Sequence, residues 1–339
     1  MLLLANGSRN PQWKWYSDCA KAEPGGGYLG FLYSMQLAGL EGKPPPNLPA
    51  SRCFRGTGIA VMNTNLLDGK NNIQIDFKSS PFGRQSHGYN SNNAFLLNIN
   101  GQRAFISSGN RDLYGSEHHR KWMCETKSDN AILVNGKGQI PHAPAARGHI
   151  SAFETSPTVD VVVGEAAESY KDLQRWTRRI LFFKPHAVLV HDILDAPEPA
   201  TFDWLLHGMG RFTIENQEVR WEGAAGKAHI QFLEPDRLAV SQTDFMDPPP
   251  GDYAQLKWKE WHLSAQAVEK TQHREFIVLF TLQDASVTAE YEKGTPAHIH
   301  LQFTDATAEV SLAPDQFEIN APGFAKTLKN VAGPAVVLQ

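Results

Sequence analysis

The sequence predicts a mainly β fold, in which stacked antiparallel β-sheets form a β-sandwich preceded by a short N-terminal helical segment. Short apolar runs of β type recur along most of the chain, with turn residues about every 8–12 positions. Asn100–Gly101, a dipeptide that favours the positive φ angles of a tight hairpin turn, separates two of these runs. Helical texture is confined to the residues before a proline-rich stretch at 44–49.

Composition bounds the class of protein. The 339 residues, of which 41% are hydrophobic and 20% charged, suit a large globular β body with an appendage and exclude a disordered chain. The net charge of −4 argues against a protein that binds nucleic acid through phosphate contacts. No apolar run approaches the roughly 20 residues of a membrane helix. Cys19, Cys53 and Cys124 lie far apart without a CxxC pair, so neither a disulfide framework nor a cysteine zinc site is predicted.

Residues 11–42 predict two short helices. Trp13 and Trp15 precede a break at 24–27, and Phe31 and Leu32 follow it at helical spacing. Because two short helices cannot bury so much aromatic surface, we expect the last turns of a helical body, or a cap on the β body. The stretch 44–49 predicts a stiff linker and the domain boundary. The apolar start at 1–5 is too short for a secretory signal, so we expect either a cytosolic protein or a chain that begins inside a longer parent.

Strand patterns dominate beyond residue 50. Asp68–Gly69 and Asn135–Gly136 repeat the hairpin signature of Asn100–Gly101. No fixed-period repeat and no GxGxxG or GxxxxGK[ST] loop is present, so nucleotide binding is not indicated. The main β-type runs are residues 58–62, 73–77, 94–99, 104–107, 159–163, 179–183, 187–192, 202–207, 276–280 and 298–303.

The densest polar stretch spans residues 79–97. His87 lies there between a glycine-bearing loop and an apolar strand, and alternation places His87 and Tyr89 on one face. So many amide and hydroxyl groups before a strand are typical of a site that hydrogen-bonds a hydroxyl-rich ligand. The same composition also fits a polar loop with a surface histidine. The polar neighbours of His87 are Arg84, Gln85, Ser86, Tyr89, Asn90, Asn92 and Asn93.

A second polar cluster spans residues 107–122. Its cations could meet an anionic substrate, and its tyrosine and histidines could transfer protons or donate hydrogen bonds. The alternative is a charged surface loop with a turn capped at Ser116. The cations are Arg111, Arg120 and Lys121, and the other groups are Tyr114, His118 and His119.

Other candidate sites are weaker. His298 and His300 share one strand face and could chelate a metal, but no third ligand is near in sequence, which favours ordinary strand residues. No GxSxG elbow is present, and the cysteines lack a nucleophile context.

The two polar clusters resemble the heparinase II/III-like polysaccharide lyases. The resemblance covers residues 50–210 well and the rest more loosely, and its runs are specific only when taken together. The matching runs are Ser86–His87 with Asn93 and Phe95, the Tyr-Gly-Ser-x-His-His-Arg-x-Trp run at 114–122, the run at 130–139, Arg178–Arg179 with His191–Asp192, and Trp204 to His207.

The resemblance implies a fold and an activity. The family has an α/α toroid followed by stacked antiparallel sheets, with the active cleft between them. Residues 1–49 would be a helical remnant of the toroid plus the linker, and 50–339 the β-sandwich. The family cleaves uronic-acid polysaccharides, glycosaminoglycan or alginate, by β-elimination. A neutralised C5 carboxylate acidifies the C5 proton, a base removes it, and an acid protonates the departing oxygen.

The resemblance also implies the site residues. His87 matches the histidine that the sandwich contributes, whereas the family's catalytic tyrosine, asparagine and second histidine belong to the toroid. We therefore expect little or no lyase turnover from this chain alone. The predicted catalytic residues are His87 and Tyr114, and the predicted substrate-binding residues are Arg84, Tyr89, Asn93, Arg111, His119 and Arg120.

Many family members bind a structural zinc through His, Asp and His. The matching positions here are Tyr89, Ser107 and Asp129. A phenol, a hydroxyl and one carboxylate make a poor zinc site, so we expect no metal or other cofactor and a sandwich that folds without zinc.

The expected partners are an anionic polysaccharide and the missing N-terminal toroid, with no nucleic acid and no membrane span. By resemblance the protein would be periplasmic or extracellular, and the full-length parent would be a polysaccharide lyase. The alternative is a non-catalytic carbohydrate-binding or scaffold protein on the same sandwich.

Overall fold

The computed structural model describes residues 7–21, 27–36, 39–84, 88–109, 112–251 and 259–330. The chain divides into two compact units, Met1–Pro49 and Ala50–Gln339. The first contains helices α2 (Pro11–Cys19) and α3 (Gly27–Gln36). Helix α2 begins at Asn10, whose Oδ1 accepts a hydrogen bond from the Gln12 amide at 2.8 Å, with a proline at the first helical position.

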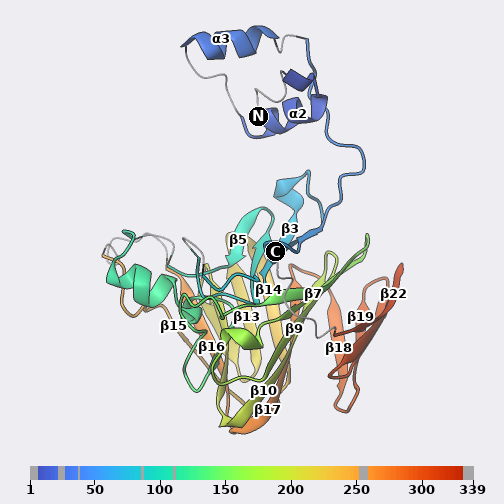
Figure 1. The fold of residues 1–339 in the computed structure, drawn as a ribbon. Coiled ribbons are helices and arrows are strands. Elements are labelled where there is room, and N and C mark those ends of the chain that lie inside the picture. Colours follow the sequence, from blue (N-terminus) through green and yellow to red (C-terminus); the bar gives the residue numbers. More distant parts are fainter. Residues whose placement is uncertain are drawn as a thin grey trace. The chain divides into compact units, whose positions relative to one another are not determined.

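The second unit contains three antiparallel sheets (Figure 1). Sheet A runs β1-β2-β3-β4-β5-β11-β16-β15, with β6 also paired to β11, and sheet B runs β12-β13-β14-β17-β10-β9-β8-β7. Sheet A consists of β1 (Arg52–Phe54), β2 (Ile59–Asn63), β3 (Ile73–Lys78), β4 (Ala94–Ile99), β5 (Gln102–Phe105), β6 (Ile132–Val134), β11 (Phe202–Gly208), β15 (Leu238–Thr243) and β16 (Trp261–Ala267). Sheet B consists of β7 (His149–Thr155), β8 (Val159–Glu165), β9 (Arg175–Phe183), β10 (Ala187–Ala200), β12 (Phe212–Glu215), β13 (Glu218–Gly223), β14 (Gly226–Glu234) and β17 (Thr271–Leu282).

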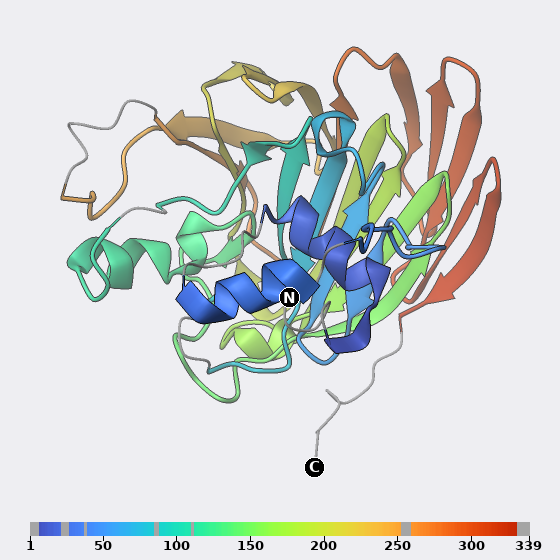
Figure 2. The same ribbon diagram turned by 90° about the horizontal axis from the view of Figure 1, so that it is seen from above.

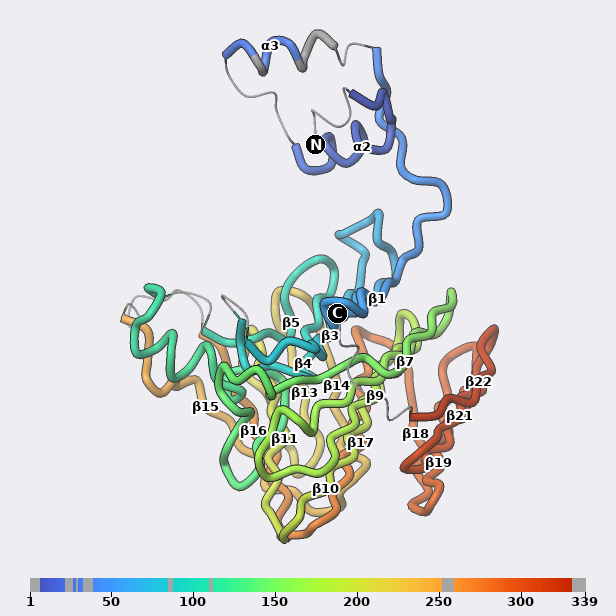
Figure 3. Tube along the Cα trace, in the orientation of Figure 1, coloured from blue at the N-terminus to red at the C-terminus, as the bar shows by residue number. Residues whose placement is uncertain are grey.

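Sheet C is a simple meander, which the trace in Figure 3 shows in orange to red. Short helical turns lie in the connections of sheets A and B. Sheet C consists of β18 (Val287–Glu292), β19 (Ala297–Phe303), β20 (Thr307–Leu312), β21 (Gln316–Ala321) and β22 (Phe324–Lys329). The turns are η1 (Gly69–Asn71), the π-helical η2 (His119–Met123), η3 (Thr126–Ser128) and η4 (Ala167–Ser169).

Sheet B is the middle layer, and its central strands are apolar on both faces. Val162 on β8 packs into the core that sheets A and B share, whereas its neighbour Val161 packs into the core between sheets B and C. Sheet C buries only one face, so β19 alternates buried Ile299 with exposed His298. Figure 2 shows sheet C as the red layer at one side of the sandwich.

An ion pair without solvent exposure sits in the core of sheets A and B. Arg178 on β9 and Asp192 on β10 are both 0% exposed, and they meet through two parallel hydrogen bonds of 2.7 and 2.9 Å. The indole N–H groups of Trp176 and Trp204 donate to the same carboxylate at 2.8 and 3.1 Å. The carboxylate thus has four donors, as a buried charge requires.

The same guanidinium also binds the backbone of sheet A. Arg178 Nη1 donates to the carbonyl oxygens of Asn93 at 2.8 Å and Asn130 at 2.7 Å. The Asn130 side chain in turn donates to the Phe95 carbonyl and accepts from the His207 amide, each at 2.7 Å. The starts of β4 and β6 are thereby held in one place relative to sheet B.

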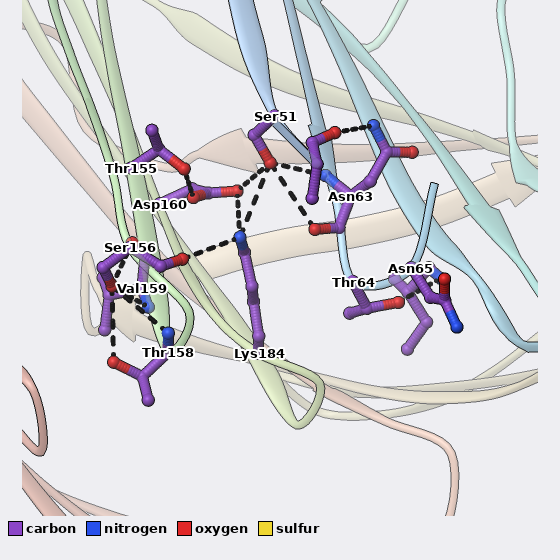
Figure 4. A network of polar contacts seen from close by, with 12 residues as sticks. Ser51, Asn63, Thr64, Asn65, Thr155, Ser156, Thr158, Val159, Asp160 and Lys184 are labelled. Atoms are coloured by element: carbon purple, nitrogen blue, oxygen red, sulfur yellow. Dashed lines mark hydrogen bonds and ion pairs between the residues drawn. The ribbon is translucent and has the colours of Figure 1, made fainter. Parts of the chain in front are cut away.

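A second buried charge cluster ties the edge of sheet A to sheet B (Figure 4). Lys184 Nζ lies 2.7 Å from Asp160 Oδ2 and donates to the Ser156 carbonyl at 3.1 Å. Ser51 donates to the same carboxylate at 2.5 Å and accepts from the Asn63 amide at 2.9 Å. Each charge therefore has several partners. Because Asp160 lies on β8, the cluster links Ser51, which precedes β1, to that strand.

The mainly β prediction is confirmed, as are two of the three predicted hairpin turns. Asn100–Gly101 has φ angles of 54° and 70°, and Asn135–Gly136 of 51° and 72°. Asp68–Gly69 instead leads into the turn η1 within a longer loop between β2 and β3. That loop is organised by Asn72, whose Oδ1 accepts from the Thr64 and Asn65 amides at 3.1 and 2.9 Å.

Candidate functional site

A polar cluster forms where the segment before β4 meets the turn η2. The Tyr89 and Tyr114 rings lie 6.3 and 4.7 Å from the His119 ring, centroid to centroid. Cys124 Sγ lies 3.8 Å from His119 Nε2. The structure therefore brings together three of the predicted site residues, drawn from both polar stretches of the sequence.

Backbone and amide contacts hold the segment that carries Tyr89. The Asn90 amide donates to the Cys124 carbonyl at 3.2 Å, and Thr126 donates its hydroxyl to the Asn90 carbonyl at 2.8 Å. The Gln139 side chain pairs with the backbone of Asn92 through two hydrogen bonds of 2.9 Å. The backbone that follows Tyr89 is thus held by η3 and by the turn after β6.

Two ionisable residues, Lys78 and Asp129, lie near the segment that carries Tyr89. Lys78 Nζ, at the end of β3, donates to the Tyr89 carbonyl at 3.1 Å and to Ser91 Oγ at 3.0 Å. Asp129 is 3% exposed, and its Oδ2 has no hydrogen-bond partner among the described residues. Burial raises the pKa of Asp129 to about 7, against the opposing effects of a hydrogen bond from Ser107 and the Lys78 charge. Burial lowers the pKa of Lys78, against the Asp129 charge.

The electrostatic setting of Tyr89 favours its neutral form. Burial raises the pKa of the Tyr89 phenol, and Cys124 and Asp129 raise it further. Burial likewise raises the pKa of the Cys124 thiol, with Glu125 and Asp129 adding to the effect. A phenol in this setting stays protonated and is suited to donate a hydrogen bond.

Two neutral histidines lie in contact with each other, next to the backbone of Asp129. His207 Nδ1 lies 2.9 Å from His262 Nδ1, and its Nε2 lies 3.1 Å from the Asp129 carbonyl oxygen. Burial, with His262 nearby, holds the pKa of His207 well below its usual value, and burial lowers the pKa of His262 to about 4. The sequence placed His207 in a run that resembles the family but did not assign it, His262 or Lys78 to the site. The strand β16 carries no polar run, and Lys78 continues an ordinary strand alternation.

Three further residues of the two polar stretches are described by the structure. Arg84 is exposed in the loop after β3, and Arg120 is exposed and paired with Glu117 at 2.6 Å. His118 is buried, with Nδ1 2.7 Å from the Pro248 carbonyl oxygen. His87 and Arg111 fall outside the described residues.

The prediction that Asn93 binds substrate is wrong. Its side chain is 0% exposed, so no ligand reaches it. Its Nδ2 donates to the carbonyls of Gly164 and Trp176 at 3.2 and 3.3 Å, and its φ of 55° suits an asparagine at a turn. Asn93 therefore fixes the start of β4 within the sandwich.

The residues at the positions that match the family's zinc ligands fit a zinc ion poorly. Asp129 is hydrogen-bonded by Ser107, and Tyr89 offers a phenol whose pKa is raised. Only one of these three groups is a usual zinc ligand, and the nearby Lys78 ammonium opposes a second cation. Among the described ranges, no three His, Cys, Asp or Glu side chains gather as a metal ion would require.

Comparisons with known proteins identify a family and a fold that this chain matches. Residues 46–330 match the family model described as heparinase II/III-like, C-terminal. A search of curated protein sequences returns no match. Heparan sulfate lyase HepC from Pedobacter heparinus is similar over 91% of this chain and 48% of its own, at 17% identity and a TM-score of 0.66. Two structures of heparinase III are similar over 96% of this chain and 48% of their own, at 14% and 13% identity and TM-scores of 0.65 and 0.60.

The fold is therefore that of the sheet domain of polysaccharide lyases. The chain belongs to the heparinase II/III-like family and matches its C-terminal part. It spans about half the length of the solved structures that it resembles, 48% in each case. Within the described ranges, no helix has both the length and the apolar character needed to cross a bilayer.

Replacing Asp129 by Asn should remove a pH dependence of stability. The folded-state pKa of Asp129, about 7 against an ordinary 3.8, means that the fold binds this proton more tightly than the unfolded chain. Its stabilising contribution is therefore complete below about pH 4 and lost as the pH rises to about 7. Asp129→Asn should match the parent at about pH 4 and exceed it at pH 8 by on the order of 4 kcal/mol in urea unfolding.

Asp305→Asn, at an exposed position of the turn before β20, is the matched control and should follow the parent at both pH values. An Asp129→Asn variant that is less stable than the parent at pH 8 would show that the ionised carboxylate is the form the fold prefers.

Proposed function

We propose that this chain is the β-sandwich half of a polysaccharide lyase that cleaves a uronic-acid-containing anionic polysaccharide, glycosaminoglycan or alginate, by β-elimination. The family assignment and the likeness to lyase structures support this proposal. The observation that carries it is the Tyr89–Tyr114–His119 cluster, in which phenols and an imidazole from two sequence stretches meet where the segment before β4 contacts η2.

The elimination needs three functions around one sugar ring. The C5 carboxylate must be neutralised, a base must take the C5 proton, and an acid must protonate the leaving oxygen. On this proposal His87 takes part in proton transfer or carboxylate neutralisation. Tyr114 assists His87 in the proton transfer, Tyr89, held neutral by its surroundings, donates a hydrogen bond to the sugar, and His119 lines the sugar site.

The rest of the catalytic set would come from an α/α toroid that precedes the sandwich. The chain spans 48% of the solved lyases, which leaves room for such a domain in a full-length parent. Catalysis of this kind depends on placing all groups around the substrate at once, so a half-site loses most of its effective molarity. A lone histidine contributes roughly 10²–10⁴-fold.

Because its substrate would be a large external polymer, we also infer a periplasmic or extracellular location for the parent protein. Fractionation of the native host would test this, and recovery of the protein in the cytosol would contradict it.

The 339-residue chain alone should show little or no lyase turnover. The assay follows the ultraviolet absorbance of the unsaturated product on heparan sulfate, chondroitin, hyaluronan and alginate. Joined to its N-terminal toroid half, the chain should cleave one of these polymers, and His87→Ala should then lower kcat by roughly 10²–10⁴-fold.

His298→Ala, on the exposed face of sheet C, is the matched control and should leave kcat unchanged. Strong turnover by the chain alone would show that the catalytic set is complete within it. No turnover by the joined protein, with intact polysaccharide binding, would favour the alternative of a carbohydrate-binding or scaffold protein.

We further propose that the sandwich folds without zinc. Tyr89, Ser107 and Asp129 offer one usual zinc ligand, next to the Lys78 ammonium. The purified chain should contain no stoichiometric zinc, and a chelator should leave its Tm unchanged, because no metal binding energy would be lost. One bound zinc per chain together with a large drop in Tm in chelator would refute the proposal.

A further inference from the structure

A lysine-rich cavity lies beside the candidate site, between η2–η3, the turn after β6 and the loop after η4. Its volume is about 610 Å³, within the usual range for a small-molecule site. Three separate chain segments therefore supply its walls. Its charged lining residues are Lys121, Lys127, Lys137, Lys171, Glu125 and Asp172.

The charge of this cavity is opposite to that of the chain. Four lysines face two carboxylates in a protein whose net charge is −4. Lys121 is paired with Glu117 at 2.5 Å, and Lys127 donates to the Asp247 carbonyl at 2.7 Å. Lys137 and Lys171 have no ion-pair partner within the described part of the chain, and neither do Glu125 and Asp172. The lining as a whole therefore keeps an excess of ammonium groups that attracts an anion.

The two unpaired lysines are attached to well-held backbone. Lys137 closes the Asn135–Gly136 turn, in which its amide and carbonyl pair with those of Val134 at 2.9 Å. Lys171 follows Tyr170, a buried residue whose hydroxyl donates to the Ile132 carbonyl at 2.5 Å. Ordered attachment points reduce the entropy that binding costs.

The cavity shares structure with the candidate site. Thr126 lines the cavity and donates its hydroxyl to the Asn90 carbonyl, in the segment that carries Tyr89. Glu125, which also lines the cavity, directly follows Cys124 of the site cluster. One polymer chain could therefore contact both places.

We propose that this lysine cavity is an accessory subsite that binds a sulfate or carboxylate group of the anionic polysaccharide, away from the sugar that is cleaved. The inference rests on the proposed function for the identity of the polymer. A sugar-sized cavity lined by four lysines and two carboxylates keeps a positive excess that fits such a group, whereas a neutral polysaccharide would gain nothing from it.

The test compares Lys137→Gln/Lys171→Gln with the matched control Lys70→Gln/Lys270→Gln, which removes the same charge at exposed positions outside the cavity. Calorimetry measures binding of a size-defined heparan sulfate oligosaccharide to the full chain, at low and at physiological salt. The cavity variant should bind roughly tenfold more weakly at low salt, with less salt dependence, and the control within about twofold of the parent. Thermal melting confirms that both variants fold.

Equal binding by the cavity variant and the control would overturn the subsite. The subsite would also be overturned if Tyr89→Phe weakened binding and the cavity variant did not. It would be overturned as well if the parent chain bound the desulfated, carboxyl-reduced oligosaccharide as tightly as the native one. Absence of binding by the parent chain would overturn it as well. The lyase assay of the joined protein judges the proposed function separately, since it does not depend on Lys137 or Lys171.

Discussion

The Arg178–Asp192 pair is the constraint on which the sandwich and its candidate site depend. Two charges at 0% exposure have a desolvation cost of several kcal/mol per ion, which is offset only when each lone pair and each N–H has a partner. Two indoles complete the carboxylate, and two backbone carbonyls accept both hydrogens of Arg178 Nη1. Because those carbonyls belong to Asn93 and Asn130, the ion pair fixes the positions at which strands β4 and β6 of sheet A begin.

The geometry of the candidate site depends on the two backbone carbonyls that Arg178 binds. Asn93 ends the segment that carries Tyr89, and Asn130 follows Asp129, so both functional groups lie one to four residues from a backbone atom held by Arg178. Lys78 then ties β3 to the Tyr89 carbonyl. The electrostatic result is a phenol that stays protonated near a buried carboxyl, so that Tyr89 can donate a hydrogen bond.

Local sequence signals predicted local structure. The turn at Asn100–Gly101 needs only two residues that accept positive φ, and the double-faced strands of sheet B need only unbroken apolar runs. Asn93 was misassigned because the sequence pattern of a polar residue before a strand is the same in two cases. Its amide can face solvent, or it can donate a hydrogen bond to a buried carbonyl. Lys78 carried no signal, since its role arises from residues 89–91 and from Asp129, which only the folded chain brings near. Long-range pairing of this kind is set by packing, not by a local pattern.

Hydrogen exchange measured by mass spectrometry on Arg178→Lys tests the anchoring most directly. Lysine keeps the charge but cannot reproduce both the paired contact with Asp192 and the bonds to two carbonyls. Peptides covering 88–95 and 126–134 should then exchange at least about tenfold faster than in the parent, while sheet C peptides covering 297–321 keep the parent rate. Unchanged protection at 88–95 and 126–134, or equal loss across all three regions, would contradict the account.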